Sequence, residues 1–137
     1  MNQTAKQRPP MAGFHHFSAT VTNVEASAAW YQRVLELERI PGTFPHYGSE
    51  DSGYAVILTD FKSRIVFVLQ HHSANDGQPF AESRTGLDHI GISVPSRSDL
   101  ESWKEWLDSS AVSHSGVTDI DNVIKYSALV FRDPDNI

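Results

Sequence analysis

An internal duplication constrains this chain more than any other feature of its sequence. Residues 13–21 and 86–94 carry the same pattern 73 positions apart, and each is followed by apolar residues at helical spacing. Four identities at this offset are more than ordinary composition gives by chance. The matched pairs are Gly13/Gly86, His16/His89, Val21/Val94 and Trp30/Trp103. We therefore expect two copies of one module, each with a histidine in its first strand.

The first copy, residues 13–72, is predicted to be a strand, a helix and three further strands. Alternate residues from Phe14 to Val21 point to opposite faces, so that His16, Ser18 and Thr20 share the more polar face. Thr22–Asn23 can cap a helix, which we expect to end near Glu38. The further strands are expected within 39–47, at 54–59 and at 65–70.

The second copy, residues 86–137, follows a polar linker at 73–85 that contains Gly77 and Pro79. We expect a strand at 86–94 and then a helix from Ser96 or Ser98 to about Ser109. Strands at 112–114 and 126–131 and a turn at 133–136 should follow. By the logic of the repeat, the last strand of this module is absent from the chain. Residues 1–11, which include Pro9–Pro10, are expected to form a flexible arm or to pack on a neighbouring molecule.

Composition is typical of a soluble globular domain, and the expected strands and helices make its fold class α+β. The 137 residues are 39% hydrophobic and 20% charged, enough for one core spanning residues 12–137. A net charge of −6 argues against nucleic acid and anionic membranes as partners. The chain has no cysteine, no long apolar span and no signal peptide, so we expect a cytoplasmic protein without disulfides.

The two matched histidines are the candidate metal ligands. First strands related by a pseudo-twofold axis would bring His16 and His89 together on the concave side of a curved sheet. Two imidazoles and one carboxylate form an open site for Fe, Mn, Ni or Zn. The competing interpretation is that each histidine is a hydrogen-bonded structural residue, which is the commoner case for a single strand histidine.

A substrate would lie beside these histidines. Ser18, Thr20 and Ser93 are small polar residues on the same strand faces, so they leave room for a ligand. Tyr47 and Phe80, together with Phe44, lie in loops with proline or glycine and could line the mouth of a cavity. The acidic pairs Glu50–Asp51 and Asp119/Asp121 are expected to be solvated in loops. No residue is singled out as a catalytic acid, base or nucleophile.

Five segments together resemble the vicinal oxygen chelate superfamily, which includes glyoxalase I, bleomycin-resistance proteins, fosfomycin-modifying enzymes and extradiol dioxygenases. They are His16–Val21, Ser27–Tyr31, Val34–Leu37, Gly86–Val94 and Phe131–Ile137. The resemblance implies paired βαβββ modules that form a curved mixed sheet around a cavity, with His16 and His89 as ligands of a divalent metal. Val68 stands where glyoxalase I has a glutamate ligand. The glutamate of the fosfomycin-modifying and extradiol enzymes corresponds to a position three residues past Ile137.

Three functional hypotheses follow from the resemblance. The first is a metal-dependent lyase, dioxygenase or thiol transferase that acts on a small oxygen-bearing substrate. The second is a metal-free ligand-binding protein of the bleomycin-resistance type, and the third is a truncated, inactive member. An unfilled sheet edge would favour a homodimer.

Overall fold

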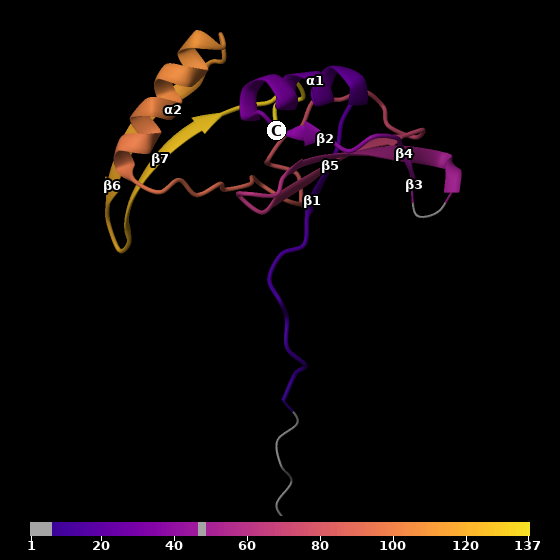
Figure 1. The fold of residues 1–137 in the computed structure, drawn as a ribbon, viewed down its shortest axis with the longest axis horizontal. Coiled ribbons are helices and arrows are strands. Elements are labelled where there is room, and N and C mark those ends of the chain that lie inside the picture. Colours follow the sequence, from indigo (N-terminus) through magenta and orange to yellow (C-terminus); the bar gives the residue numbers. More distant parts are fainter. Residues whose placement is uncertain (1–6, 47–48) are drawn as a thin grey trace, which may run out of the picture.

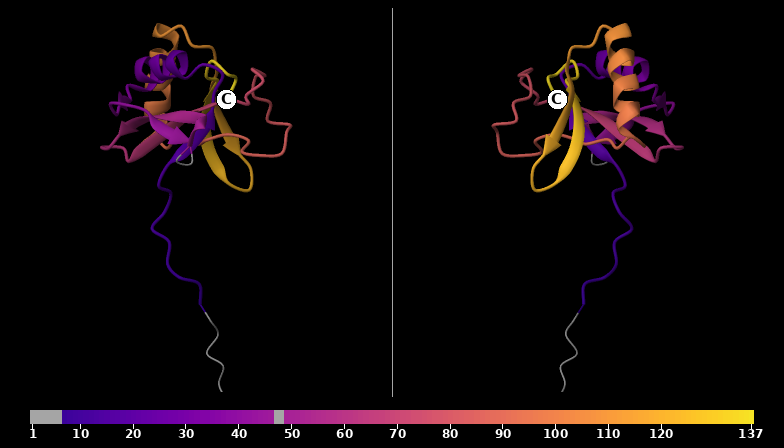
Figure 2. Two further views of the ribbon diagram at one scale, coloured as in Figure 1. Left: turned by 90° about the vertical axis from the view of Figure 1, so that its right-hand side faces the viewer. Right: turned by 90° about the vertical axis from the view of Figure 1, so that its left-hand side faces the viewer.

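A computed structural model describes residues 7–46 and 49–137 of the chain. Two helices lie against two β-sheets, α1 over the larger sheet and α2 beside the smaller one (Figures 1 and 2). The elements are β1 (Phe17–Thr20), α1 (Val24–Leu35), β2 (Glu38–Arg39), β3 (Phe44–His46), β4 (Ser49–Asp60), β5 (Ile65–His72), α2 (Arg97–Ser109), β6 (His114–Asp121) and β7 (Lys125–Phe131). This is the predicted mixed α+β fold with a curved sheet. Neither helix in the described part of the chain is long and apolar enough to cross a membrane.

The larger sheet has the strand order β1-β5-β4-β2, and β3 also pairs with β4. β1 runs parallel to β5, with Phe17 opposite Phe67 and Thr20 opposite Gln70. β4 and β5 form the predicted antiparallel hairpin, although β4 begins five residues earlier than residue 54, where the sequence placed it. The first half of the chain therefore follows the predicted order, except that two short strands, β2 and β3, stand where the sequence predicts a single strand within 39–47.

The N-terminus of α1 is the one that the sequence predicts. The side chain of Asn23 accepts a hydrogen bond from the Ala26 amide at 3.0 Å, which satisfies one of the free donors of the first turn. The C-terminus differs from the prediction. Glu36 adopts a left-handed conformation with φ of 52° and ends the helix at Leu35, so the extension to Glu38 is wrong.

The main core lies between α1 and the larger sheet. The alternation of β1 is confirmed, because Phe17 and Ala19 pack toward this core while Ser18 and Thr20 are exposed on the other face. The fully buried members come from α1, β4, β5 and the connections beside them. They are Val21, Val24, Ala28, Tyr31, Leu37, Val56, Leu58, Phe67 and Leu69.

A smaller core joins the two halves. Val34 of α1 packs with Leu107 and Val112, and Trp106 donates a hydrogen bond from Nε1 to the Val34 carbonyl oxygen at 2.8 Å. Ser96 caps α2, and the helix ends at Ser109 as predicted. Leu107 is its one buried residue, whereas Leu100 and Trp103 are half-buried, because β6 and β7 alone cover less of the helix than a full sheet would.

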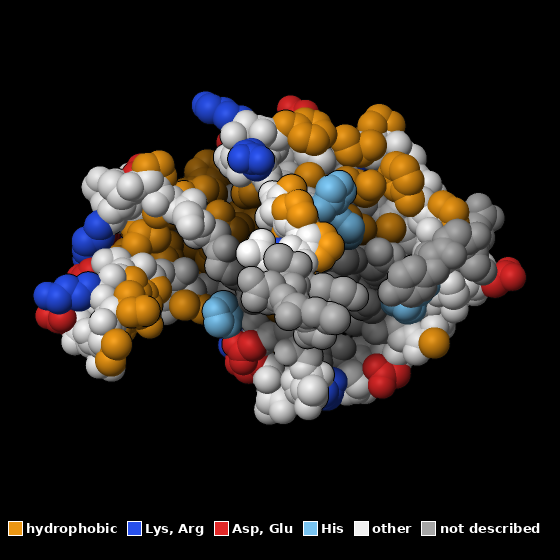
Figure 3. All heavy atoms as spheres, turned by 90° about the horizontal axis from the view of Figure 1, so that it is seen from below, with side chains coloured by type: hydrophobic (Ala, Val, Ile, Leu, Met, Phe, Trp, Pro, Cys, Tyr) orange, Lys and Arg blue, Asp and Glu red, His pale blue; other side chains and the backbone are white. Residues whose placement is uncertain are grey.

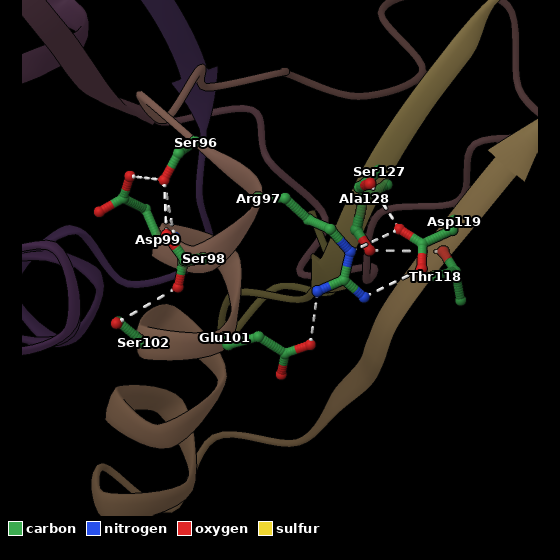
Figure 4. Close-up of polar contacts among 10 residues, drawn as sticks. All are labelled: Ser96, Arg97, Ser98, Asp99, Glu101, Ser102, Thr118, Asp119, Ser127 and Ala128. Carbon is green, nitrogen blue, oxygen red and sulfur yellow. Dashed lines mark hydrogen bonds and ion pairs between the residues drawn. The ribbon is translucent and has the colours of Figure 1, made fainter.

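A polar network fastens α2 to the hairpin of β6 and β7 (Figure 4). The guanidinium of Arg97 donates two hydrogen bonds to the carboxylate of Asp119, at 2.8 and 2.9 Å, and a third to Glu101. Ser127 donates a further hydrogen bond to Asp119. Asp119 and Asp121 are both exposed, as predicted. Their assignment to a loop is wrong, because both belong to β6, which occupies residues 114–121 and not 112–114.

The predicted strand at 86–94 is also wrong, because this segment is extended but forms no ladder. Within the described chain, the backbone groups of residues 86–94 make no hydrogen bond. The first copy of the motif is a strand because β5 pairs with it. Alternation alone cannot make a strand without a neighbour, and no described strand takes the corresponding place beside 86–94. The repetition of the whole module remains a prediction.

The C-terminal turn, residues 132–137, connects the second half to the first half and to the linker. Asp133 is buried and accepts a hydrogen bond from the Tyr31 hydroxyl at 2.8 Å. Asp135, also buried, accepts hydrogen bonds from the amide and the hydroxyl of Thr22, at 3.0 and 2.6 Å. Arg132 forms an ion pair with Glu82 of the linker at 2.6 Å.

Candidate functional site

The candidate site is built on the face of the larger sheet that α1 does not cover. Ser18 and Thr20 of β1 lie on this face beside Val68 and Gln70 of β5, because residues two apart in a strand share a face. The Gln70 amide nitrogen donates a hydrogen bond to the Ser18 hydroxyl at 3.1 Å. The Gln70 amide oxygen is buried and has no protein partner among the described residues. This face is therefore partly polar, as the sequence predicts.

His16 lies immediately before β1 and is exposed. Its Nδ1 lies 2.9 Å from Nδ1 of His15, and the two rings meet edge to face. The ring is exposed, and its one hydrogen-bond contact among the described residues is with the adjacent His15.

His89 lies in the extended segment 86–94, and its side chain is 81% exposed. The carboxylate of Asp88 lies 2.6 Å from Nδ1 of this histidine. Many metal-binding histidines are oriented in this way: one ring nitrogen is hydrogen-bonded to a carboxylate, and the other ring nitrogen points outward to the metal. The sequence did not single out Asp88 for this role, although it adjoins a candidate ligand.

The imidazole nitrogens of the two histidines are suitable donors for a divalent metal, but two ligands are too few to form a site. Neutral imidazoles are ordinary ligands of Fe, Mn, Ni and Zn. In residues 7–46 and 49–137, however, no three histidine, aspartate or glutamate side chains lie close enough to hold an ion. No hydrogen bond or ring contact joins His16 to His89 in this part of the chain. Residues of the described chain do not by themselves complete a metal site.

A cavity of about 280 Å³ opens at the end of β1, between the linker and the C-terminal turn. Thr20 and Phe80, both proposed from the sequence as substrate contacts, line it. Arg84, Asp135 and Thr22 also line it, and the sequence did not identify these three. The sequence predicts only a turn at 133–136, and that local pattern does not indicate that its side chains line a cavity.

The remaining candidates lie elsewhere. Ser93 is exposed in the segment 86–94, and Phe44 is exposed on β3. Tyr47 lies outside the described residues. The ring of His72 packs on that of His46, with centroids 4.0 Å apart. Burial, with a smaller effect of the neighbouring His72, lowers the pKa of His46.

Comparison with known proteins gives one family. Residues 13–137 match the model of the Glyoxalase/Bleomycin resistance protein/Dioxygenase superfamily.

Two curated relatives match at low identity. MhqA of Bacillus subtilis (strain 168), provisionally named a ring-cleaving dioxygenase, is 28% identical over 116 residues, which are 77% of this chain and 33% of MhqA. The polyunsaturated fatty acid lipoxygenase ALOX15B of Rattus norvegicus is 31% identical over 106 residues, which are 74% of this chain and 14% of that protein. The chain thus spans a third or less of the length of these relatives.

Solved structures share the fold. A glyoxalase/bleomycin resistance protein/dioxygenase domain from Frankia sp. EAN1pec superposes with a TM-score of 0.78 at 26% identity, covering 93% of this chain and 94% of that one. The fosfomycin resistance protein FosX from Listeria monocytogenes, as a point mutant with Mn(II) and dihydroxypropylphosphonic acid, gives a TM-score of 0.59 at 13% identity, covering 93% of this chain and 88% of that one. At that identity the likeness to FosX concerns the fold alone.

Proposed function

Because the chain belongs to the glyoxalase/bleomycin resistance protein/dioxygenase superfamily, we propose that it is a divalent-metal-dependent enzyme acting on a small oxygen-bearing molecule. The observation that carries the proposal is the pair of exposed imidazoles at equivalent places in the duplicated motif, His16 and His89. A bound metal would supply Lewis-acid chemistry, or dioxygen chemistry if it is iron. The provisional naming of MhqA as a ring-cleaving dioxygenase favours the second type.

The roles of the protein residues follow from where they lie. His16 and His89 would be ligands, and Asp88 would hold the His89 ring by its Nδ1. A third ligand would be needed, and among residues 7–46 and 49–137 no third histidine, aspartate or glutamate gathers with these two. Ser18 and Thr20 would contact the substrate on the uncovered face of the sheet, and Phe80 and Ser93 would be outlying contacts.

The test is the metal content of the full chain, purified without chelator or metal-affinity tag and measured by elemental mass spectrometry. We expect about one Fe, Mn, Ni or Zn per chain, and its loss from the double variant His16→Ala, His89→Ala. The matched control is the double variant His71→Ala, His72→Ala, which also removes two imidazoles, neither of them in contact with His16 or His89, and should keep the metal. Metal retained without His16 and His89, or absent from the natural chain after each ion is added back, contradicts the proposal.

A second candidate function is metal-free binding of a small ligand, and the cavity of about 280 Å³ at Thr20 and Phe80 favours it. The discriminating measurement is ligand binding by calorimetry with and without a chelator. Binding that persists without metal and is weakened by Phe80→Ala would support this function over the first.

A further inference from the structure

The cavity at the end of β1 is lined by hydrogen-bond donors that the fold does not use. It has a volume of about 280 Å³ and lies between β1, the linker and the C-terminal turn. The side chains of Thr20, Arg84 and Thr85 line it, and none of them forms a hydrogen bond or an ion pair with another described residue. These donors are therefore available to a ligand.

The two carboxylates that line the same cavity already accept hydrogen bonds from the protein. Asp135 is buried and accepts from the amide and the hydroxyl of Thr22, at 3.0 and 2.6 Å. Asp76 accepts a hydrogen bond from the amide of Gln78 at 3.1 Å. In the described part of the chain, neither carboxylate pairs with Arg84. The guanidinium can only donate hydrogen bonds, so its partner must be an acceptor on a ligand or water.

Arg84 differs in this respect from most arginines of the chain. Arg39, Arg97 and Arg132 form ion pairs with carboxylates. Arg64 resembles Arg84, because neither side chain has a partner among the described residues, but Arg64 is exposed in the turn between β4 and β5. Only Arg84 of these five lines the cavity. Arg64 is therefore a matched control for it.

Apolar side chains form another part of the cavity wall. Phe80 is half-buried and Leu87 is 56% exposed. The backbone of Phe80 is held at both ends: its amide donates to the carbonyl oxygen of Asp135 at 2.9 Å, and its carbonyl oxygen accepts from the side-chain amide of Asn136 at 3.0 Å. A fixed aromatic side chain in the same cavity as a free cation is suited to a ligand with an apolar body and an anionic group.

The charges around the cavity limit the ligand to one negative charge. Asp76 and Asp135 line the same walls as Arg84, so they would repel a dianion. The whole chain carries −6, and on the face shown in Figure 3 the described basic side chains are scattered among acidic ones. A single carboxylate remains favourable, because its two oxygens match the planar fork of a guanidinium.

We propose that this cavity binds a small organic acid, whose carboxylate pairs with the guanidinium of Arg84 and whose apolar body packs against Phe80. The hydroxyls of Thr20 and Thr85 supply further donors. The proposal names the ligand class of the metal-free binding function, on which it rests, and does not involve the metal.

An NMR titration of the isotope-labelled full chain, in buffer that contains a chelator, compares benzoate with benzamide. The two probes have the same ring and nearly the same shape, but only benzoate is charged. We expect benzoate to shift the amide signals of Phe80 and Arg84 and to bind about tenfold more tightly than benzamide, because hydrogen bonds to a charged group are the stronger ones. Phenyl phosphate, which carries up to about two negative charges at pH 7, should bind more weakly than benzoate.

Substitutions of the two unpaired arginines test the anchor. Arg84→Gln should remove the preference for benzoate over benzamide, whereas Arg64→Gln should retain it. Arg84→Lys should keep part of the preference, because it keeps the charge but not the planar fork. Neither arginine has a described side-chain partner, so melting temperatures should show that all three variants fold like the natural chain.

The outcomes separate the ligand class from the binding function. Equal binding of benzoate and benzamide at the cavity, or a preference that Arg84→Gln retains, overturns the carboxylate site and leaves metal-free binding intact. Tighter binding of phenyl phosphate than of benzoate also overturns it. Cavity signals that move with none of the three probes contradict both the ligand class and the binding function.

Discussion

Gly53 shows at the scale of one residue how closely two strands approach in the larger sheet. It lies in β4 opposite His72, with a positive φ of 142°. A Cβ at this position would lie 1.8 Å from the backbone carbonyl oxygen of His71. Only glycine avoids both the clash and the backbone strain there, although the sequence alone marks Gly53 merely as the end of a loop.

We therefore expect Gly53→Ala to lower the free energy of unfolding by about 2 kcal/mol or more, because backbone atoms must move. Gly91→Ala is the matched control. A Cβ at Gly91 meets no atom within 4 Å, so its effect should stay within about 0.5 kcal/mol. Urea unfolding at 25 °C measures both variants, and similar losses would show that β4 and β5 are not as close as described.

At the scale of elements, the attachment of α2 to β6 depends on charge. The Arg97 guanidinium and the Ser127 hydroxyl lower the pKa of Asp119 from 3.8 to about 2. Because the folded state binds the proton more weakly than the unfolded state, this pair stabilises the fold above pH 3.8. The contribution is lost as the pH falls through about 2.

The variant Asp119→Asn should accordingly melt at a lower temperature than the natural chain at pH 6, and the difference should disappear toward pH 2. Asp121→Asn serves as the control, since among the described residues the side chain of Asp121 forms only an exposed ion pair, at 3.4 Å with Lys125. Melting temperatures between pH 2 and 6 measure the effect. A difference between Asp119→Asn and the natural chain that is constant over this range would mean that ionisation of Asp119 is not the cause.

At the scale of the whole molecule, the halves are held together by buried carboxylates of the C-terminal turn. Asp133 accepts hydrogen bonds from the Tyr31 hydroxyl and from the amides of Asp135 and Ile137. Burial nevertheless raises the pKa of Asp133, and it also raises the pKa of Tyr31. Because burial disfavours the ionised form of Asp133, each hydrogen bond that its carboxylate accepts contributes to stabilising that form.

Removing one hydrogen-bond donor to Asp133 should destabilise the connection between the two halves. Tyr31→Phe is expected to lower the free energy of unfolding by about 1–3 kcal/mol, the cost of leaving a buried acceptor with one partner fewer. The loss should be larger at pH 7 than at pH 4, because the hydroxyl stabilises the ionised form of Asp133. Tyr54→Phe is the control, as no hydrogen bond of its hydroxyl is found among the described residues. Guanidinium unfolding at both pH values provides the measurement, and equal losses in the two variants would refute the role of Asp133.

Sequence signals that span only a few residues were sufficient to predict much of the fold. Asn23 and Ser96 begin the two helices because each side chain satisfies an amide three residues later. The faces of β1 follow from alternation, and the hairpin of β4 and β5 follows from two apolar runs around a polar turn. The family likewise follows from the motifs at His16, at 86–94 and at 131–137. The metal-ligand roles of His16 and His89 remain predictions.

The sequence by itself thus determined where the two helices begin, the faces of β1 and the β4–β5 hairpin, because those depend on local periodicity and capping. It also determined the family of this protein, because the motifs that identify the family are short. Only the tertiary structure decided that 86–94 is not a strand, that Asp119 pairs with Arg97, and that Asp133 and Asp135 connect the halves. The physical reason is that a ladder, an ion pair and a buried carboxylate each need a partner distant in the chain, here 22 positions away for Asp119 and 102 for Asp133. The local sequence pattern identifies polar side chains that need such partners, and only the tertiary fold brings those partners close enough to bind.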